Sequence, residues 1–199
     1  MGDGVRERRG SNLPADLTSF VGRRPELREV KHLLTTTRLL TLTGSGGVGK
    51  TRLALRAATE MSRGFPDGAW LVQLAPIHDP LLVTQAVFSA LGVHDLSAGL
   101  SLSSLTEYVA GKRLLLVLDN CEHLLDARAV LAVTLVKACP QLRLLATSRQ
   151  PLGVTGEARM VVPPMALPVE GDEVSAQRLL GSDAVGCSAS APRPWSPAS

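Results

Sequence analysis

A glycine-rich run that ends in a lysine and a threonine carries the clearest chemistry in the sequence. Residues 44–51 read Gly-Ser-Gly-Gly-Val-Gly-Lys-Thr and fit the pattern Gly-x-x-x-x-Gly-Lys-[Ser/Thr] at every position. Glycines let backbone N–H groups close around an anionic phosphate, and a helix that follows directs its positive dipole end there. In such a loop Lys50 reaches the β- and γ-phosphates and the Thr51 hydroxyl binds Mg²⁺. The alternative is a glycine-rich turn with an incidental lysine.

We therefore assign the loop and the first helical turn after it to nucleotide binding. The assigned residues are Gly44, Ser45, Gly46, Gly47, Val48, Gly49, Lys50, Thr51 and Arg52. The guanine-specific pattern Asn-Lys-x-Asp is absent from the sequence, and so is the Asp-x-x-Gly of small GTPases. The expected ligands are therefore the adenine nucleotides ATP and ADP, with Mg²⁺.

An apolar run that ends in an aspartate supplies a partner for the metal. Leu114–Leu118 consists of apolar residues and is followed directly by Asp119. In doubly wound α/β folds, ligands bind at the edge where the parallel strands end. We predict that Asp119 holds Mg²⁺ through water, although aspartate at such a place is also a common helix N-cap.

Two further residues are candidates for the hydrolytic step. Many ATPases place an acid directly after the metal-binding aspartate, but this chain has Asn120 there. Glu122 either orients the attacking water or simply begins the next helix. Arg149 follows another apolar strand and either faces the γ-phosphate, which arginine binds bidentately, or lies exposed in a loop. Lys50, Asp119, Glu122 and Arg149 form the predicted catalytic set.

Helical and strand-like patterns alternate along the chain and must position these residues. Strands are predicted at 38–43, 69–74, 113–118, 142–147 and 159–162, and helices at 26–34, 50–63, 79–91, 103–110 and 122–138. The strands are uniformly apolar, which is typical of a parallel sheet covered by helices on both faces. The fold class is therefore α/β.

Composition and charge limit the classes of partner. The 199 residues carry a net charge of +3, and aromatic residues make up 3%. Residues 1–38 hold 8 basic and 5 acidic side chains, whereas the rest holds 13 of each. The excess charge thus lies near the N-terminus, and we expect no direct DNA binding. No run approaches the length of a membrane span, no signal sequence is recognisable, and the expected compartment is the cytoplasm.

Domain boundaries follow from shifts in composition. We expect a flexible arm over 1–17, a core over 18–168, the start of a further helix over 169–180, and a disordered Ser/Ala/Pro tail over 181–199. The three cysteines, Cys121, Cys139 and Cys187, have neither disulfide nor zinc spacing and are interpreted as ordinary thiols.

Four motifs, taken in order, resemble one family. Phe20–Arg23, the loop at 44–51, the segment 114–123 (Leu-Leu-Leu-Val-Leu-Asp-Asn-Cys-Glu-His) and Ala146–Arg149 are similar to motifs of the signal-transduction ATPases with numerous domains (STAND). The likeness is greatest to the NB-ARC module of bacterial LuxR-type and antibiotic-regulator transcriptional regulators, which is AAA-like.

The resemblance implies a P-loop NTPase fold, a three-layer sandwich with a five-stranded parallel sheet in the order 5-1-4-3-2. It places adenine on the backbone of Val21, Gly22 and Arg23, and it makes Arg149 the sensor of the γ-phosphate. It also implies an ATP/ADP switch that is closed with ADP and able to oligomerise with ATP. Family members continue into a helical lid and a winged helix, so the sequence looks like a truncated copy.

The function expected from the sequence is a nucleotide switch that binds Mg-ATP or Mg-ADP. It would be a slow ATPase at most and part of a bacterial transcriptional regulator. Its expected partners are adenine nucleotide and a second copy or a longer family member. The alternatives are a free-standing P-loop hydrolase or kinase, and a non-catalytic fragment.

Overall fold

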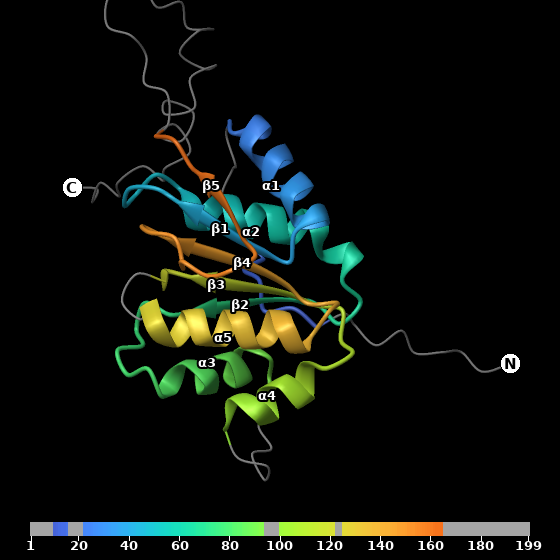
Figure 1. The fold of residues 1–199 in the computed structure, drawn as a ribbon. Coiled ribbons are helices and arrows are strands. Elements are labelled where there is room, and N and C mark those ends of the chain that lie inside the picture. Colours follow the sequence, from blue (N-terminus) through green and yellow to red (C-terminus); the bar gives the residue numbers. More distant parts are fainter. Residues whose placement is uncertain (1–9, 16–21, 94–99, 122–124, 165–199) are drawn as a thin grey trace, which may run out of the picture.

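Five parallel strands form the centre of the molecule, and helices cover both faces (Figure 1). The computed structural model describes residues 10–15, 22–93, 100–121 and 125–164. The strands are β1 (Leu39–Thr43), β2 (Ala69–Gln73), β3 (Leu115–Asp119), β4 (Arg143–Ser148) and β5 (Glu157–Val161). The helices are α1 (Arg24–Thr36), α2 (Lys50–Met61), a 3₁₀ turn η1 (Ser62–Gly64), α3 (Leu82–Ala90), α4 (Leu102–Val109) and α5 (Leu125–Ala138).

The strand order is β2-β3-β4-β1-β5, which confirms the predicted order 5-1-4-3-2 and the P-loop NTPase fold class. Helices α1 and α2 lie on one face of the sheet, and α3, α4 and α5 lie on the other. Strand β1, which leads into the glycine-rich loop, is paired with β4 on one side and β5 on the other. The ends of β1, β3 and β4 therefore meet at one edge of the sheet.

Both faces of the central strands are buried, which explains why their sequences are continuously apolar. Along β3, Leu115 and Val117 pack in the cluster under α1 and α2, whereas Leu116 and Leu118 pack in the cluster under α3, α4 and α5. Successive side chains of a strand point to opposite faces, so every position needs an apolar residue here. Fully burying one such side chain stabilises the fold by roughly 1.5–3 kcal/mol.

The last strand begins earlier than the sequence predicts. The apolar pattern places it at 159–162, but β5 begins at Glu157. The Glu157 side chain is completely buried and accepts hydrogen bonds inside the fold. A charged residue at the start of a strand gives no periodic signal, so the prediction began after it.

Part of the segment predicted as a flexible arm lies against the sheet edge. Ser11 forms a parallel bridge with Ala69, and its hydroxyl donates to the Ala69 carbonyl at 2.9 Å. The Asn12 side chain donates to the Leu71 carbonyl at 2.8 Å and accepts from the Leu71 N–H at 2.6 Å. Residues 10–15 thus form hydrogen bonds with backbone N–H and C=O groups of β2, the edge strand, that would otherwise face solvent.

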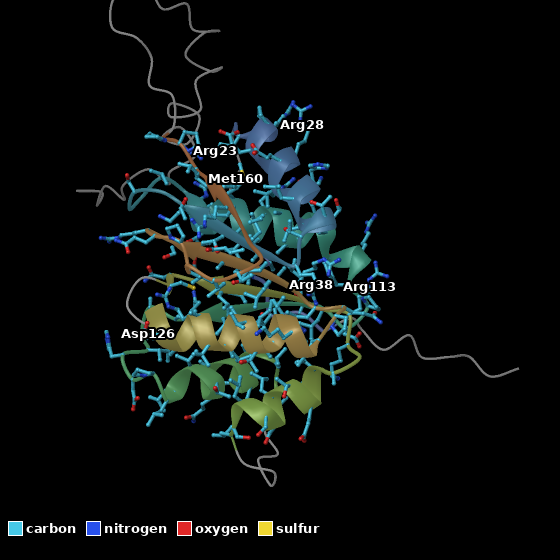
Figure 2. The ribbon with its side chains drawn as sticks, viewed as in Figure 1. Arg23, Arg28, Arg38, Arg113, Asp126 and Met160 are labelled. Carbon is cyan, nitrogen blue, oxygen red and sulfur yellow. The ribbon has the colours of Figure 1, made fainter. Side chains whose placement is uncertain are left out.

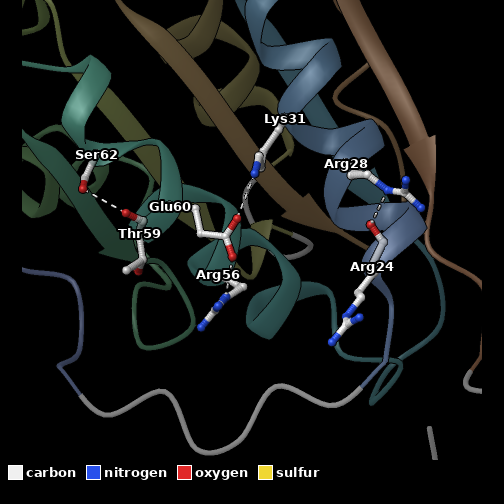
Figure 3. A network of polar contacts seen from close by, with 7 residues as sticks. All are labelled: Arg24, Arg28, Lys31, Arg56, Thr59, Glu60 and Ser62. Carbon is white, nitrogen blue, oxygen red and sulfur yellow. Dashed lines mark hydrogen bonds and ion pairs between the residues drawn. The ribbon is translucent and has the colours of Figure 1, made fainter. Parts of the chain in front are cut away.

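Ion pairs among the side chains of α1 and α2 fix these two helices relative to each other. Glu60 accepts from Lys31 and from Arg56, both at 2.8 Å (Figure 3). The hydrogen bond from Lys31 is the main reason why the pKa of Glu60 lies below its usual value. The three side chains are partly exposed, so the network adds only modest stability.

Arginines at the starts of the strands bind helix ends. Arg38 donates to the Val136 carbonyl of α5 at 2.7 Å, and Arg143 donates to the Leu34 carbonyl of α1 at 3.3 Å. Burial, together with repulsion from Arg38 and Arg113, lowers the pKa of Arg143. Figure 2 shows Arg38 and Arg113 at the end of the molecule away from Arg23. Arg38 and Arg143 thus place positive charge at the C-terminal ends of α5 and α1, where the helix dipoles are negative.

Several sequence expectations fall partly outside the described residues. Cys121 and Cys139 are buried free thiols, as expected, and Cys187 lies outside the described residues. The ranges predicted as a further helix and a disordered tail, 169–180 and 181–199, also lie outside them. Among the described residues, no helix is both long and apolar enough to span a membrane.

Candidate nucleotide-binding site

The glycine-rich loop connects the end of β1 to the start of α2, as a phosphate-binding loop requires. Gly44, Gly47 and Gly49 have φ angles of 148°, 78° and 88°. Such angles are rare for residues with a Cβ, and Gly49 is the N-cap of α2. The loop can therefore turn its N–H groups toward one point in front of the helix N-terminus, which is the geometry that binds phosphate.

Lys50 is held at the centre of this loop. Its Nζ donates to the carbonyls of Gly44 and Ser45, at 2.8 Å each. The ammonium thus sits against the first residues of the loop while its backbone belongs to the first turn of α2. This arrangement places a positive charge within the loop, next to the N-terminus of α2.

Replacing Gly44 with alanine should destabilise the fold. A Cβ at this position would stand 2.8 Å from the Val162 carbonyl oxygen, which belongs to backbone and cannot move freely. We expect Gly44→Ala to lower the free energy of unfolding by about 1–3 kcal/mol, measured by urea denaturation. Gly46→Ala is the matched control, because its Cβ would meet only the Arg149 side chain at 3.7 Å. Equal stability of the two variants would contradict this prediction.

Asp119 lies opposite the loop and binds two threonine hydroxyls. Its Oδ1 accepts from Thr51 Oγ1 and from Thr147 Oγ1, at 2.6 Å each. Thr51 comes from α2, Asp119 from the end of β3, and Thr147 from β4. The structure therefore brings the two predicted metal-binding residues, Thr51 and Asp119, into direct contact.

Thr147 is a site residue that the sequence analysis did not assign. Besides donating to Asp119, its hydroxyl accepts from the Asn120 N–H at 3.0 Å. Asn120 has a φ of 59°, and this hydrogen bond holds the turn after Asp119. The available signal was the position of Thr147 at the end of an apolar strand, but its role depends on β4 lying between β1 and β3.

A cavity of about 440 Å³ joins these groups. Its lining comes from the loop, from the first turn of α2, from the segment after β2 and from the ends of β3 and β4: Gly46, Gly47, Gly49, Lys50, Thr51, Arg52, Ala75, Asp119, Asn120, Thr147 and Arg149. Arg149 and Arg52 are thus brought to the loop, and an Arg149 Nη2 lies 3.7 Å from the position of a Cβ on Gly46. Val48 instead packs against the apolar core under α2.

Two residues of the predicted adenine segment, Gly22 and Arg23, lie within the described part of the chain. Gly22 and Arg23 do not line this cavity. Arg23, which precedes α1, is 4% exposed and donates from Nη2 to the Pro163 carbonyl at 2.7 Å. It therefore ties the start of α1 to the segment that follows β5, near Met160 in Figure 2. Val21 and the predicted hydrolytic residue Glu122 lie outside the described residues.

The oxygen groups at the cavity suit a hard cation. Mg²⁺ prefers carboxylate, hydroxyl and phosphate oxygens and keeps several waters, so one or two protein ligands are enough. Asp119 and Thr51 supply such oxygens beside the phosphate-type loop. The part of the chain that the structure describes contains no group of three or more His, Cys, Asp or Glu side chains placed to bind a metal.

The chain is similar to several proteins of known sequence, some of which are named as regulators. The chain is 42% identical over 163 residues to an uncharacterized protein of Mycobacterium tuberculosis, covering 81% of this chain and 41% of that protein. It is 45% identical over 149 residues to a protein of the same organism described as an HTH-type transcriptional regulator, covering 75% and 17%. The Regulatory protein AfsR of Streptomyces griseus is 31% identical over 193 residues, covering 88% and 19%. The chain thus spans less than half of each relative.

Solved structures share the fold. A STAND protein with a tetratricopeptide repeat sensor from Pyrococcus horikoshii matches with a TM-score of 0.50 and 19% identity, over 75% of this chain and 24% of that one. The ORC2 protein of Aeropyrum pernix, solved as ADPNP-ADP complexes, matches with a TM-score of 0.51 and 16% identity, over 67% and 43%. The NB-ARC domain family matches residues 25–165. The chain therefore belongs to the NB-ARC domain family.

Proposed function

We propose that this chain is the nucleotide-binding core of a switch that takes Mg-ATP or Mg-ADP and hydrolyses ATP slowly at most. The arrangement of Lys50, Thr51 and Asp119 around one cavity carries this proposal. Bound Mg²⁺ would neutralise phosphate charge next to Asp119. The loop amides and Lys50 would bind the phosphates, and Asp119 would orient the Thr51 hydroxyl.

Slow turnover is proposed because of the residue that follows Asp119. Asn120 lines the cavity, and a carboxamide does not take a proton from water at neutral pH. Phosphate release faster than about 1 s⁻¹ by the purified chain would instead favour the alternative of a P-loop hydrolase. The regulatory role belongs to a longer protein, in which this core would respond to nucleotide and associate with further copies.

Calorimetric titration with ATP and with ADP tests the proposal, and Arg149→Ala sharpens it. Arg149 lies at the cavity edge beside Gly46, where the end of the triphosphate would lie. We expect Arg149→Ala to weaken ATP binding by at least about tenfold, the value of one charge-assisted hydrogen bond, and to leave ADP binding nearly unchanged. Arg28→Ala, which removes an exposed guanidinium of α1 outside the cavity, is the matched control. Equal losses for both nucleotides would contradict a γ-phosphate role.

A further inference from the structure

The connection from β4 to β5 is unusual for a parallel pair. It runs over residues 149–156, passes β1, which lies between the two strands, and contains no helix (Figure 1). Parallel crossovers normally need a dozen or more residues, and a helix usually satisfies their backbone groups. The N–H groups of this short crossover therefore need other partners.

Glu157 supplies partners for two of these N–H groups. Its Oε1 accepts from the Leu152 N–H at 2.7 Å, and its Oε2 accepts from the Gly153 N–H at 3.0 Å. Arg159 donates from Nε to the same Oε2 at 3.0 Å. Burial acts to raise the pKa of Glu157, but the hydrogen bonds that the carboxylate accepts outweigh it, and the pKa lies below its usual value. Glu157 is therefore ionised at neutral pH.

The anchored part of the crossover is close to Arg149 in sequence. Only Gln150 and Pro151 separate Arg149 from Leu152, and proline fixes its own φ near −65°. The Leu152 side chain is 7% exposed and packs in the core under α3, α4 and α5. On the other side of Arg149, Ser148 is the last residue of β4. Arg149 thus lies in a short segment that is fixed at one end by β4 and at the other by Leu152.

We infer that Glu157 is a positioning residue for nucleotide discrimination: by fixing the 149–156 crossover, it holds Arg149 at the phosphate end of the cavity. This inference rests on the proposed function. Glu157 does not line the cavity and touches no group there, so it acts only through the crossover. Glu157 and Ser148, the residue before Arg149, lie at opposite ends of the parallel strands. Glu157 pairs in register with Leu39 at the start of β1, whereas Ser148 pairs with Thr43 at its end.

Glu157→Gln tests the inference while preserving the volume of the side chain. One carboxylate oxygen becomes an NH₂ group that faces an N–H donor, so one crossover amide loses its acceptor. In the full chain without nucleotide, we expect faster hydrogen exchange at the Leu152 and Gly153 amides. We also expect the ratio of ATP to ADP affinity to fall by about five- to tenfold, at the lower end of typical coupling between sites.

A double-mutant comparison separates positioning from general loss of stability. In an Arg149→Ala background, Glu157→Gln should cause no further change in the ATP-to-ADP ratio, because its effect passes through Arg149. Glu60→Gln is the matched control, since it removes another ion-paired carboxylate outside the cavity and should leave the ratio unchanged.

The outcomes distinguish this inference from the proposed function. If the wild-type chain discriminates between the nucleotides through Arg149 while Glu157→Gln leaves the ratio and the amide exchange unchanged, the inference alone is overturned. An effect of Glu157→Gln that persists in the Arg149→Ala background overturns it as well. A wild-type chain that binds neither nucleotide overturns both the proposed function and the role of Glu157.

Discussion

Lys50→Ala is expected to weaken the binding of ATP and of ADP by at least about tenfold. The Gly44 and Ser45 carbonyls hold the Lys50 ammonium against the glycine-rich loop, next to the N-terminus of α2. A hydrogen bond from a charged donor to phosphate contributes roughly 1.5–3 kcal/mol, and each 1.4 kcal/mol changes a dissociation constant tenfold. Both nucleotides have a β-phosphate, so both should lose affinity. Isothermal titration calorimetry measures the change directly.

The matched control for this variant is Lys112→Ala. Lys112 lies over the Tyr108 ring, with Nζ 4.4 Å from the ring centroid, and does not line the cavity. Its removal also lowers the net charge by one but should leave both affinities unchanged. The melting temperature of each variant shows whether it has folded. Lys50→Ala that is folded and binds both nucleotides as the wild type does would overturn the assignment of the site.

The fold could be predicted from the sequence because its determinants are local or repetitive. Apolar strands such as Leu115–Asp119 need burial on both faces, and alternation with amphipathic helices leaves few parallel arrangements. The strand order came from the resemblance to a family rather than from periodicity, and the structure confirms it. The position of the glycine-rich loop between β1 and α2 was equally predictable, since its residues are contiguous in the sequence.

Contacts between distant segments could not be predicted in this way. Thr147 binds Asp119 only because β4 lies beside β3 in the sheet. The spacing of residues in the sequence does not predict that these two strands are neighbours. Glu157 interrupts the apolar pattern of β5, since its carboxylate binds amides of its own crossover. Asn12 reads as part of a polar arm, yet its side chain pairs with the Leu71 backbone across 59 positions. Each of these polar side chains forms hydrogen bonds with a backbone or carboxylate group that only the fold brings near.

Asp119 also depends on the fold for its partners, the hydroxyls of Thr51 and Thr147, and its role in binding Mg²⁺ can be tested by substitution. Asp119→Asn is expected to abolish most of the gain in nucleotide affinity that Mg²⁺ provides. The asparagine carbonyl can still accept from the Thr51 and Thr147 hydroxyls, so the geometry at the end of β3 is retained while the negative charge is lost. We expect the dissociation constant measured with Mg²⁺ to approach the value measured with EDTA.

Two comparisons decide whether this effect comes from the metal or from the hydroxyl network. Asp126→Asn removes an exposed carboxylate from the first turn of α5, and its Mg²⁺ dependence should equal that of the wild type. Thr147→Val removes a hydroxyl from Asp119 but no negative charge, so it should retain most of the Mg²⁺ effect. If Thr147→Val and Asp119→Asn lose the Mg²⁺ effect equally, Asp119 acts by ordering the strand ends and not by holding the cation. If only Asp119→Asn loses it, the carboxylate charge itself attracts Mg²⁺ to the phosphates.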